Sequence, residues 1–322
     1  MTAQAMFFLR SRPEFGSVLI ALLLALFFSV SSEGVWLNIG NIESIFQVTA
    51  ILAIMAFGQS YVITVGEIDI SVGSIFGVSA LTYLGLAESM GALVAVPAAL
   101  TFAVFIGFLN GIFVNYFRIP SLIATLGTLF VFRGIAYALT EDATYAATTE
   151  LRETNFFHAF GGDSFLGFNT AIWWAIGVLF ILHVTLFYTP FGNRILAIGG
   201  HEGSALSRGV RTNRMKVVAF MICGLTAGFA GVLEANHIGF ADGSFGRLME
   251  LEAIASTVLG GCILAGGRSS IIGTLCGAFI LSGIQSYLVV MSIQPQWYMF
   301  FLGIIVILAS FSNNKIGSLI KI

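Results

Sequence analysis

Chemistry in this chain has to come from a few polar side chains, because its apolar stretches contain little else that could bind or react. Carboxylate, amide and hydroxyl groups occur within or beside these stretches, for example at Asp69, Asn110 and Thr128. Such groups either hydrogen-bond between packed helices or line a hydrophilic path for a hydroxyl-rich solute. The candidate pathway residues are Asp69, Ser71, Asn110, Thr125, Thr128, Glu252 and Ser256.

These residues are not accompanied by a catalytic pattern. His201 and Glu202 begin like a zinc-protease motif, but Ala205 stands where the second histidine would be needed. Glu250 and Glu252 are two residues apart and lie on different faces of a helix, which does not suit paired acid–base work. The three cysteines lack metal-ligand spacing. We therefore predict that this chain is not an enzyme, with no catalytic residue, no metal site and no cofactor bound by this chain.

The sequence contains no phosphate-binding loop with which this chain could itself use ATP. Such a loop ends in Gly-Lys-Ser/Thr, whereas the three lysines follow Met215, Asn314 and Ile320. If ATP drives transport, a partner protein hydrolyses it. Proton-coupled carriers usually place acids or histidines deep in the membrane, and we expect His183 and Glu234 to lie near span ends instead. A secondary carrier or a channel that works without ATP is the alternative.

The composition describes a protein whose solvent is lipid. Of 322 residues, 57% are hydrophobic and only 9% are charged, and the mean hydropathy is +0.96. A soluble domain of this size would need far more surface charge. The net charge of -2 provides no basic field for nucleic acid. The chain is therefore predicted to be an all-α polytopic membrane protein.

About ten segments are long enough to cross a bilayer, which takes roughly 20 residues each. Their approximate ranges are 14–31, 46–65, 69–87, 92–117, 121–140, 168–189, 215–236, 250–266, 270–290 and 296–312. The joins at Gly66–Asp69 and Gly266–Ser270 are very short, so the helices there either turn back tightly or are broken and line protein. Arg133 lies inside a span, where a carboxylate or carbonyl partner is expected.

Glycines recur inside these spans with a spacing of four. The pairs Gly107/Gly111, Gly224/Gly228 and Gly273/Gly277 follow the small-xxx-small pattern, which lets helix backbones approach closely in a membrane. A weak similarity between 69–77 and 266–273 leaves an internal duplication open, since duplicated transporter folds repeat such positions. Apolar sequence also produces such matches by chance.

Charge distribution sets the predicted topology. The basic residues expected on the cytoplasmic side are Arg10, Arg12, Arg118, Arg194, Arg208, Arg211, Arg214, Lys216, Arg268, Lys315 and Lys321. The residues expected outside are mainly acidic, namely Glu33, Glu43, Glu88, Glu141, Asp142, Glu150, Glu153, Asp163 and Asp242, with Arg152 and Arg247 as exceptions. Because cytoplasmic loops collect Lys and Arg, both chain ends are predicted to be cytoplasmic.

The chain reads as a single transmembrane domain, 1–322, with two long connections. The outer one, 141–167, is expected to face the periplasm, and the inner one, 190–214, the cytoplasm. Connections of this length tend to be functional. Within the inner loop, Gly199-Gly200 predicts a turn, and 201–210 is predicted to form a short helix. The basic residues of this loop could alternatively serve only as a topological anchor.

Four sequence blocks, in order, resemble the ribose- and xylose-type ABC sugar permeases. GEIDISVGS at 66–74 is similar to that family's GGIDLSVGS signature, and the run from Asn110 to Thr128 resembles its next block. FGNRILAIGG at 191–200 is similar to its cytoplasmic loop. ELEAIASTVLGG at 250–261, followed by LAGGR at 264–268, is similar to its late signature. The blocks cover residues from about 50 to 310.

The resemblance implies a permease subunit of an ATP-driven importer in the bacterial inner membrane. Its partners would be ATPase subunits that use ATP and Mg²⁺, a second permease copy or paralogue, and a periplasmic solute-binding protein. The solute would be a sugar or a sugar-like molecule. The loop 190–214 would carry the coupling helix, whose contact with the ATPase changes access to the solute. The residues assigned to this coupling contact are Gly199, Gly200, Glu202, Ala205, Ser207 and Gly209.

The chain departs from the family pattern in three places. Glu67 replaces a glycine, and Glu252 replaces an aspartate. HEGSA at 201–205 stands where NPEAA is usual, so the expected acidic position is Gly203 and only Glu202, one place earlier, could substitute for it. The coupling contact is the part of the resemblance that these differences affect most.

Overall fold

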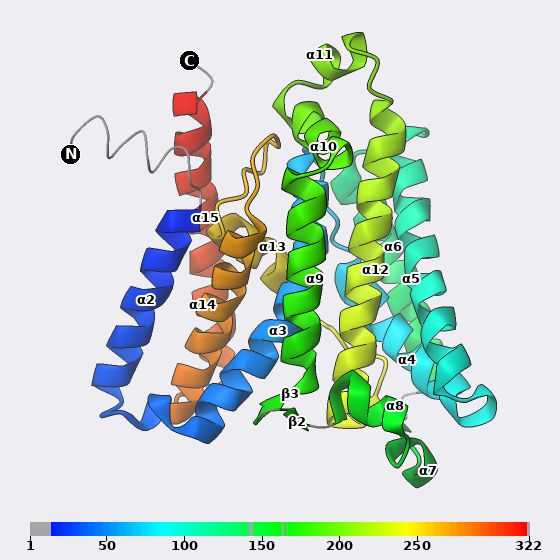
Figure 1. The fold of residues 1–322 in the computed structure, drawn as a ribbon, viewed down its shortest axis with the longest axis vertical. Coiled ribbons are helices and arrows are strands. Elements are labelled where there is room, and N and C mark those ends of the chain that lie inside the picture. Colours follow the sequence, from blue (N-terminus) through cyan, green and yellow to red (C-terminus); the bar gives the residue numbers. More distant parts are fainter. Residues whose placement is uncertain (1–13, 142–143, 163, 166, 321–322) are drawn as a thin grey trace.

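The computed structural model describes residues 14–141, 144–162, 164–165 and 167–320, and these form an α-helical protein with a few two-residue strands (Figure 1). The predicted all-α polytopic class is confirmed. Residues with a predicted location that lie outside the described ranges are Arg10, Arg12, Asp142, Asp163 and Lys321.

Ten helices correspond in order to the ten predicted segments. They are α2 (Glu14–Ser31), α3 (Ile39–Thr64), α4 (Val72–Met90), α5 (Ala92–Asn115), α6 (Ser121–Thr140), α9 (Thr170–Phe187), α12 (Thr212–Ile238), α13 (Met249–Leu259), α14 (Ile271–Val290) and α15 (Gln296–Ile320). Within the described residues, eight of these are long and apolar enough to cross a membrane. Helix α13 is too short, and the apolar stretch Gln296–Leu308 of α15 is shorter than a full span.

The predicted span at 250–266 is wrong in extent. Helix α13 has 11 residues, which at about 1.5 Å each cover roughly half of a ~30 Å hydrocarbon core. The helix ends because glycines follow it, and Gly261, Gly266 and Gly267 all adopt positive φ angles of 81° to 90°. The segment from 260 to 270 is therefore irregular, and α14 begins afresh at Ile271, where Ser270 caps it by accepting a hydrogen bond from Gly273 N.

The chain also breaks between α3 and α4. The sequence predicted a span from 69, but α4 begins at Val72, and residues 65–71 are not helical. Gly66 has φ +83°, a left-handed conformation that ends the path of α3. Asp69 and Ser71 are nevertheless fully buried. The break thus lines protein rather than lipid, as one of the two sequence hypotheses stated.

Helix α12 lies at the centre of one half of the bundle, in contact with α3, α4 and α5 (Figure 1). The predicted glycine faces produce these contacts. Gly224 on α12 lies against the carbonyl of Ala103 on α5, and Gly107 on α5 lies against the carbonyl of Phe220 on α12. A Cβ atom at either glycine would collide with that backbone, so the two helices approach as closely as only glycine permits. Gly277 on α14 lies in the same way against Ser256 of α13.

The short elements lie at the two ends of the bundle. They are η1 (Val35–Leu37), β1 (Tyr145–Ala146), α7 (Thr149–Arg152), α8 (Asn155–Phe157), η2 (His158–Gly162), β2 (Ser164–Phe165), β3 (Phe168–Asn169), α10 (Pro190–Gly200), α11 (Glu202–Ser207) and β4 (Phe240–Ala241). Strands β1 and β4 pair antiparallel, and so do β2 and β3. Helices α10 and α11 lie at one end, together with the start of α2 and the end of α15, and the other short helices and the strands lie at the opposite end (Figure 1).

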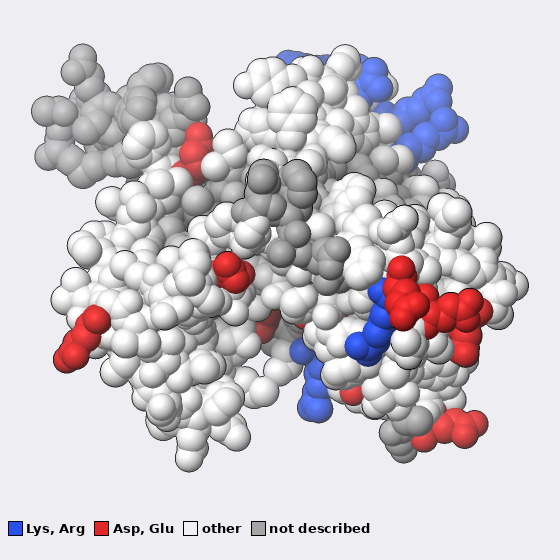
Figure 2. All heavy atoms as spheres, turned by 60° about the horizontal axis from the view of Figure 1, so that its bottom comes forward, with Lys and Arg blue, Asp and Glu red and all other residues white. Residues whose placement is uncertain are grey.

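The distribution of charge agrees with this polarity. Figure 2 shows acidic groups spread over the end that carries α7 and the strands, with some basic groups among them, and basic groups gathered at the far rim. Arg152, one of the two predicted exceptions, donates to the carbonyls of Ala147 and Gly239 and thereby ties the outer connection to the end of α12. We accordingly treat the end with α10 and α11 as the predicted cytoplasmic side.

Candidate functional site

Five of the seven candidate pathway residues meet in one buried network at the break before α4. The Asp69 carboxylate accepts hydrogen bonds from Ser71, at 2.8 Å from its backbone N and 2.6 Å from its hydroxyl. Asn110 of α5 donates from Nδ2 to the Ser71 hydroxyl (2.7 Å) and lies 3.4 Å from Asp69 Oδ2. Thr128 of α6 donates to Asn110 Oδ1 at 2.7 Å. We call Asp69, Ser71, Asn110, Thr125 and Thr128, with Gln59, the Asp69 cluster.

The backbone of the break is held by the same cluster. Thr125 of α6 accepts a hydrogen bond from Ile70 N at 3.1 Å. Gln59 of α3, with its amide oriented to satisfy both groups, donates to Asp69 O at 3.1 Å and accepts from Asp69 N at 3.2 Å. Helices α3 and α6 therefore supply partners to the backbone of a non-helical segment, and α5 supplies one to its side chains. In the sequence, Gln59 was not singled out, although it is an amide well inside the predicted span 46–65, whose other amide, Gln47, lies at its start; this position was the available signal.

This arrangement is closed in the conformation described. Asp69, Ser71, Asn110, Thr125 and Gln59 have no exposed surface, and Thr128 is 7% exposed. Each side chain has protein partners, so the cluster fixes the shape of the break. Their contact with a solute stays a prediction.

The other two candidate pathway residues lie elsewhere. Glu252 of α13 is hydrogen-bonded to Tyr298 of α15. Ser256 donates to the carbonyl of Glu252, at 2.8 Å, one turn earlier on the same helix. Among the described residues, no hydrogen bond joins either of them to the Asp69 cluster. The sequence could not show this separation, because it depends on α13 stopping short and on its packing against α14 and α15.

The candidate coupling loop forms two helices joined at a sharp corner. Thr189 caps α10 by accepting from Gly192 N, and Pro190 occupies the first turn, a combination typical of a helix start. His201 then caps α11, its Nδ1 accepting from Ser204 N at 3.1 Å. The short helix predicted at 201–210 is thus confirmed, with narrower bounds. Helix α10 was missed, although Thr-Pro at 189–190 was a signal for it.

The six predicted coupling residues divide into two groups. Gly200, Glu202, Ser207 and Gly209 are exposed, whereas Ala205 is buried. Gly199 lies against Thr64 O at the end of α3 and against the backbone of Gly267. Gly267 N in turn donates to Thr64 O at 2.9 Å. The exposed residues are available to a partner protein, while Gly199 and Ala205 attach the loop to the rest of the chain.

An ion-pair bridge makes a second attachment between the loop and the helix break. Lys216 Nζ on α12 lies 2.9 Å from Glu67 Oε1 in the break and 3.0 Å from Glu202 Oε2 on α11. Lys216 was counted from the sequence only as a topological charge. Glu67 was noted as a departure from a family pattern and Glu202 as a residue of the coupling contact, and nothing in the sequence pairs them with one lysine.

Arg133 has the carbonyl partners that its position in a span predicted. Its Nη1 atom donates to Phe245 O at 2.5 Å and to Gly243 O at 3.3 Å. Both carbonyls belong to the loop between β4 and α13, which re-enters the bundle and lies against α4 at Gly73 and Gly77. Arg133 therefore holds a second irregular segment inside the protein.

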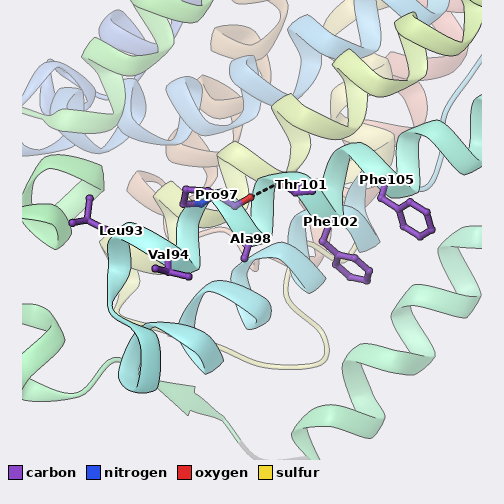
Figure 3. Close-up of a pocket in the computed structure, with 7 residues that line it drawn as sticks. All are labelled: Leu93, Val94, Pro97, Ala98, Thr101, Phe102 and Phe105. Atoms are coloured by element: carbon purple, nitrogen blue, oxygen red, sulfur yellow. Dashed lines mark hydrogen bonds between the residues drawn. The ribbon is translucent and has the colours of Figure 1, made fainter.

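Helix α5 carries an apolar hollow on its surface. Seven residues line it, among them Leu93, Phe102 and Phe105, and Figure 3 shows these side chains along one face of the helix. We interpret this hollow as part of the surface that faces acyl chains.

In the described part of the chain, no group of three or more His, Cys, Asp or Glu side chains could hold a metal ion.

Comparison with known proteins gives a consistent picture. A family model described as "Branched-chain amino acid transport system / permease component" matches residues 41–310. The chain is 34% identical over 301 residues to the ribose import permease protein RbsC of Escherichia coli K12, covering 92% of both chains. It is 33% identical to the ribose import permease protein of Bacillus subtilis, covering 85% of both chains. It is 32% identical to the autoinducer 2 import system permease protein LsrC of Salmonella paratyphi B, covering 93% of this chain and 85% of that one. No solved structure gives a significant match.

Proposed function

This chain belongs to the family of ribose/xylose-type ABC sugar permeases, and from that premise we propose that it imports a sugar or sugar-like solute across a bacterial inner membrane, driven by ATP that a partner hydrolyses. It is a transporter subunit and not an enzyme. The observation that carries the proposal is the match to a ribose import permease over 92% of both chains. Relatives are also named for autoinducer 2, so the solute class is kept to sugars and sugar-like molecules.

The architecture supports this mode of energy supply. The chain contains no Gly-Lys-Ser/Thr phosphate loop, so hydrolysis of ATP needs a separate ATPase subunit. Helices α10 and α11 project from the predicted cytoplasmic end (Figure 1) and expose Gly200, Glu202 and Ser207. We propose this corner as the surface on which the ATPase acts. A periplasmic binding protein would deliver the solute to the opposite end.

We propose that the helix break at Asp69 is the element that moves during transport. A continuous α-helix resists local bending, whereas a segment that depends on side-chain partners from α3, α5 and α6 can exchange those partners as the helices shift. The candidate pathway residues Asp69, Ser71, Asn110, Thr125 and Thr128 would then meet the solute hydroxyls when the cluster opens. Glu252 and Ser256 would contribute from α13, at a separate position.

The first test identifies the partner and the energy source together. The tagged chain is purified from its native host in mild detergent, and co-purifying proteins are identified by mass spectrometry. We expect a protein with a phosphate-binding loop. In cells, uptake of radiolabelled D-ribose should persist when an ionophore collapses the ion gradients while ATP is preserved.

Two results would contradict the proposal. Recovery of the chain only as a self-associated oligomer in several detergents would favour the secondary carrier or channel. Loss of uptake on collapse of the ion gradients, with ATP unchanged, would exclude ATP as the direct driving force. Competition of unlabelled sugars with D-ribose then defines the solute class.

A further inference from the structure

We propose that Lys216 is a positioning residue that transmits movement of the α10–α11 corner to the helix break at Asp69, through its ion pairs with Glu202 and Glu67. The inference rests on the proposed function, because it assigns a physical connection to the coupling step. Lys216 and Glu67 lie outside both the Asp69 cluster and the exposed contact surface, whereas Glu202 belongs to that surface.

The bridge joins three separate elements through one ammonium group. Glu202 is in the first turn of α11, Lys216 is in the first turns of α12, and Glu67 is in the break between α3 and α4. The side chains of Lys216 and Glu67 are 10% and 17% exposed, so their attraction is only weakly screened by solvent and salt. The Glu202 side chain is 46% exposed and forms the outer end of the bridge.

Glu67 is connected to the Asp69 cluster through a single intervening residue. Ile68 N donates to Ser121 Oγ at 3.4 Å, and Ile70 N donates to Thr125 Oγ1 at 3.1 Å. These bonds tie both sides of Asp69 to α6. A displacement of Glu67 therefore changes the positions of Asp69 and of its hydrogen-bond partners together, which is what a transmitting contact requires.

The steric contact at Gly199 and the ion pairs of Lys216 transmit movement of the α10–α11 corner in different directions. Gly199 fits against the backbone of Thr64, and this steric contact can only push on the end of α3. An ion pair can also pull, because separating a shielded ammonium from a carboxylate costs electrostatic free energy. With both contacts in place, a tilt of the α10–α11 corner moves the end of α3 and the break in either direction.

The bridge is a property of this chain rather than of the resembled pattern. Glu67 stands where the family signature has glycine, and Glu202 lies one place from the expected acidic position. Both carboxylates lie near the same Nζ atom, so without a carboxylate at 67, Lys216 would have only its outer partner.

The test distinguishes a loss of coupling from a loss of folded complex by measuring the ratio of solute imported to ATP hydrolysed. The wild-type complex, with the ATPase and binding protein that co-purify or are encoded with it, is reconstituted in proteoliposomes, and D-ribose imported per ATP hydrolysed is measured. The variants are Glu202→Gln, Glu67→Gln, the double Gln variant and Lys216→Met. Arg214→Met, an exposed cation one half-turn earlier on α12, is the matched control.

We expect the ratio to fall between about 5-fold and 150-fold in Lys216→Met, the range typical of coupling between sites. Each Gln variant should lower it, and the double variant should be no worse than Lys216→Met, because contacts in series are not additive. Arg214→Met should keep the wild-type ratio. A purely structural role would lower the amount of complex and leave the ratio unchanged.

The outcomes are distinguishable. Wild-type vesicles with no ATP-dependent uptake of D-ribose or of any other sugar-like solute that the co-purifying binding protein binds would overturn the proposed function, and the inference with it. Wild-type uptake together with unchanged ratios in Lys216→Met and both Gln variants would overturn the inference alone. Additive losses in the double Gln variant, exceeding that of Lys216→Met, would show that the two carboxylates act independently and would also reject the bridge.

Discussion

Gly199 of α10 lies directly against the carbonyl of Thr64, the last residue of α3, and against the backbone of Gly267. Three glycine-containing segments meet here, because Gly266 lies close to both Gly66 and Gly199. The two short joins that the sequence singled out, at 66–69 and at 266–270, are therefore neighbours in space, and α10 closes over both. The predicted coupling loop is attached at the point where two helices are interrupted.

Replacing Gly199 with alanine should uncouple or misplace the loop, whereas the same change at Gly200 should be tolerated. A Cβ atom at Gly199 would overlap Thr64 O and Gly267 N, and overpacking of this kind costs about 1–3 kcal/mol. A Cβ atom at Gly200 meets nothing within 4 Å. The measurement is D-ribose uptake together with the amount of ATPase retained on the purified permease. Equal uptake in the two variants would show that this contact is not needed.

The Asp69 cluster should be sensitive to the loss of a single hydroxyl. Thr128→Val removes the donor to Asn110 Oδ1 and leaves a buried acceptor unsatisfied, which costs about 1–3 kcal/mol. The matched control is Ser79→Ala, since Ser79 Oγ is buried and has no hydrogen-bond partner in the described part of the chain. Thermal unfolding in detergent should show a lower midpoint for Thr128→Val and an unchanged or higher one for Ser79→Ala. The reverse order would mean that the network does not hold the break.

The contact between α5 and α12 should not accept a single added methyl group. Gly224→Ala would place a Cβ atom against the carbonyl of Ala103, and we expect a loss of about 1–3 kcal/mol, seen as a lower unfolding midpoint. Gly127→Ala is the control, because a Cβ atom there meets nothing within 4 Å on a helix of the same protein. That control should be neutral or slightly stabilising, through the better helix propensity of alanine. Equal unfolding midpoints for Gly224→Ala and Gly127→Ala would show that close packing of α5 against α12 does not require glycine at 224.

Glu234 tests the alternative of proton coupling. Its Oε2 atom on α12 is buried and has no hydrogen-bond partner among the described residues, which is the setting of a proton relay. In an ATP-driven importer this carboxyl need not titrate, so Glu234→Gln should keep D-ribose uptake within about two-fold of wild type, with or without an ionophore. Abolished uptake with normal amounts of protein in the membrane would instead favour the secondary carrier.

Much of the fold follows from local properties of the sequence. The length of the apolar stretches predicts ten helices in the observed order, because a bilayer of fixed thickness selects segment length. The spacing of Gly107, Gly224 and Gly277 predicts close helix packing, because a glycine face is a property of one helix alone. The side on which Lys and Arg gather predicts which end carries the coupling loop.

The site itself depended on contacts between distant segments. Asp69 and Asn110 were each recognisable as unusual polar residues, but whether they touch depends on the rotation of α5 against the break, which close packing with α12 sets. From the sequence, Lys216 could be interpreted only as a surface charge. The tertiary structure places Glu202 of α11 and Glu67 of the break beside it. Arg133 needed a carbonyl partner, and only the re-entrant loop shows that Phe245 supplies it.

The sequence by itself determined that this chain spans a membrane with helices, and which polar residues were costly enough to need partners. It also located most helix ends to within a few residues, except the start of α3 and the ends of α13 and α15. The tertiary structure decided which partners they have, why α13 is only half a span, and that Glu67 and Glu202 share one lysine. The physical reason is that hydropathy and backbone propensity act within a segment, whereas hydrogen bonds and ion pairs in a low-dielectric interior depend on distances between segments that packing alone sets.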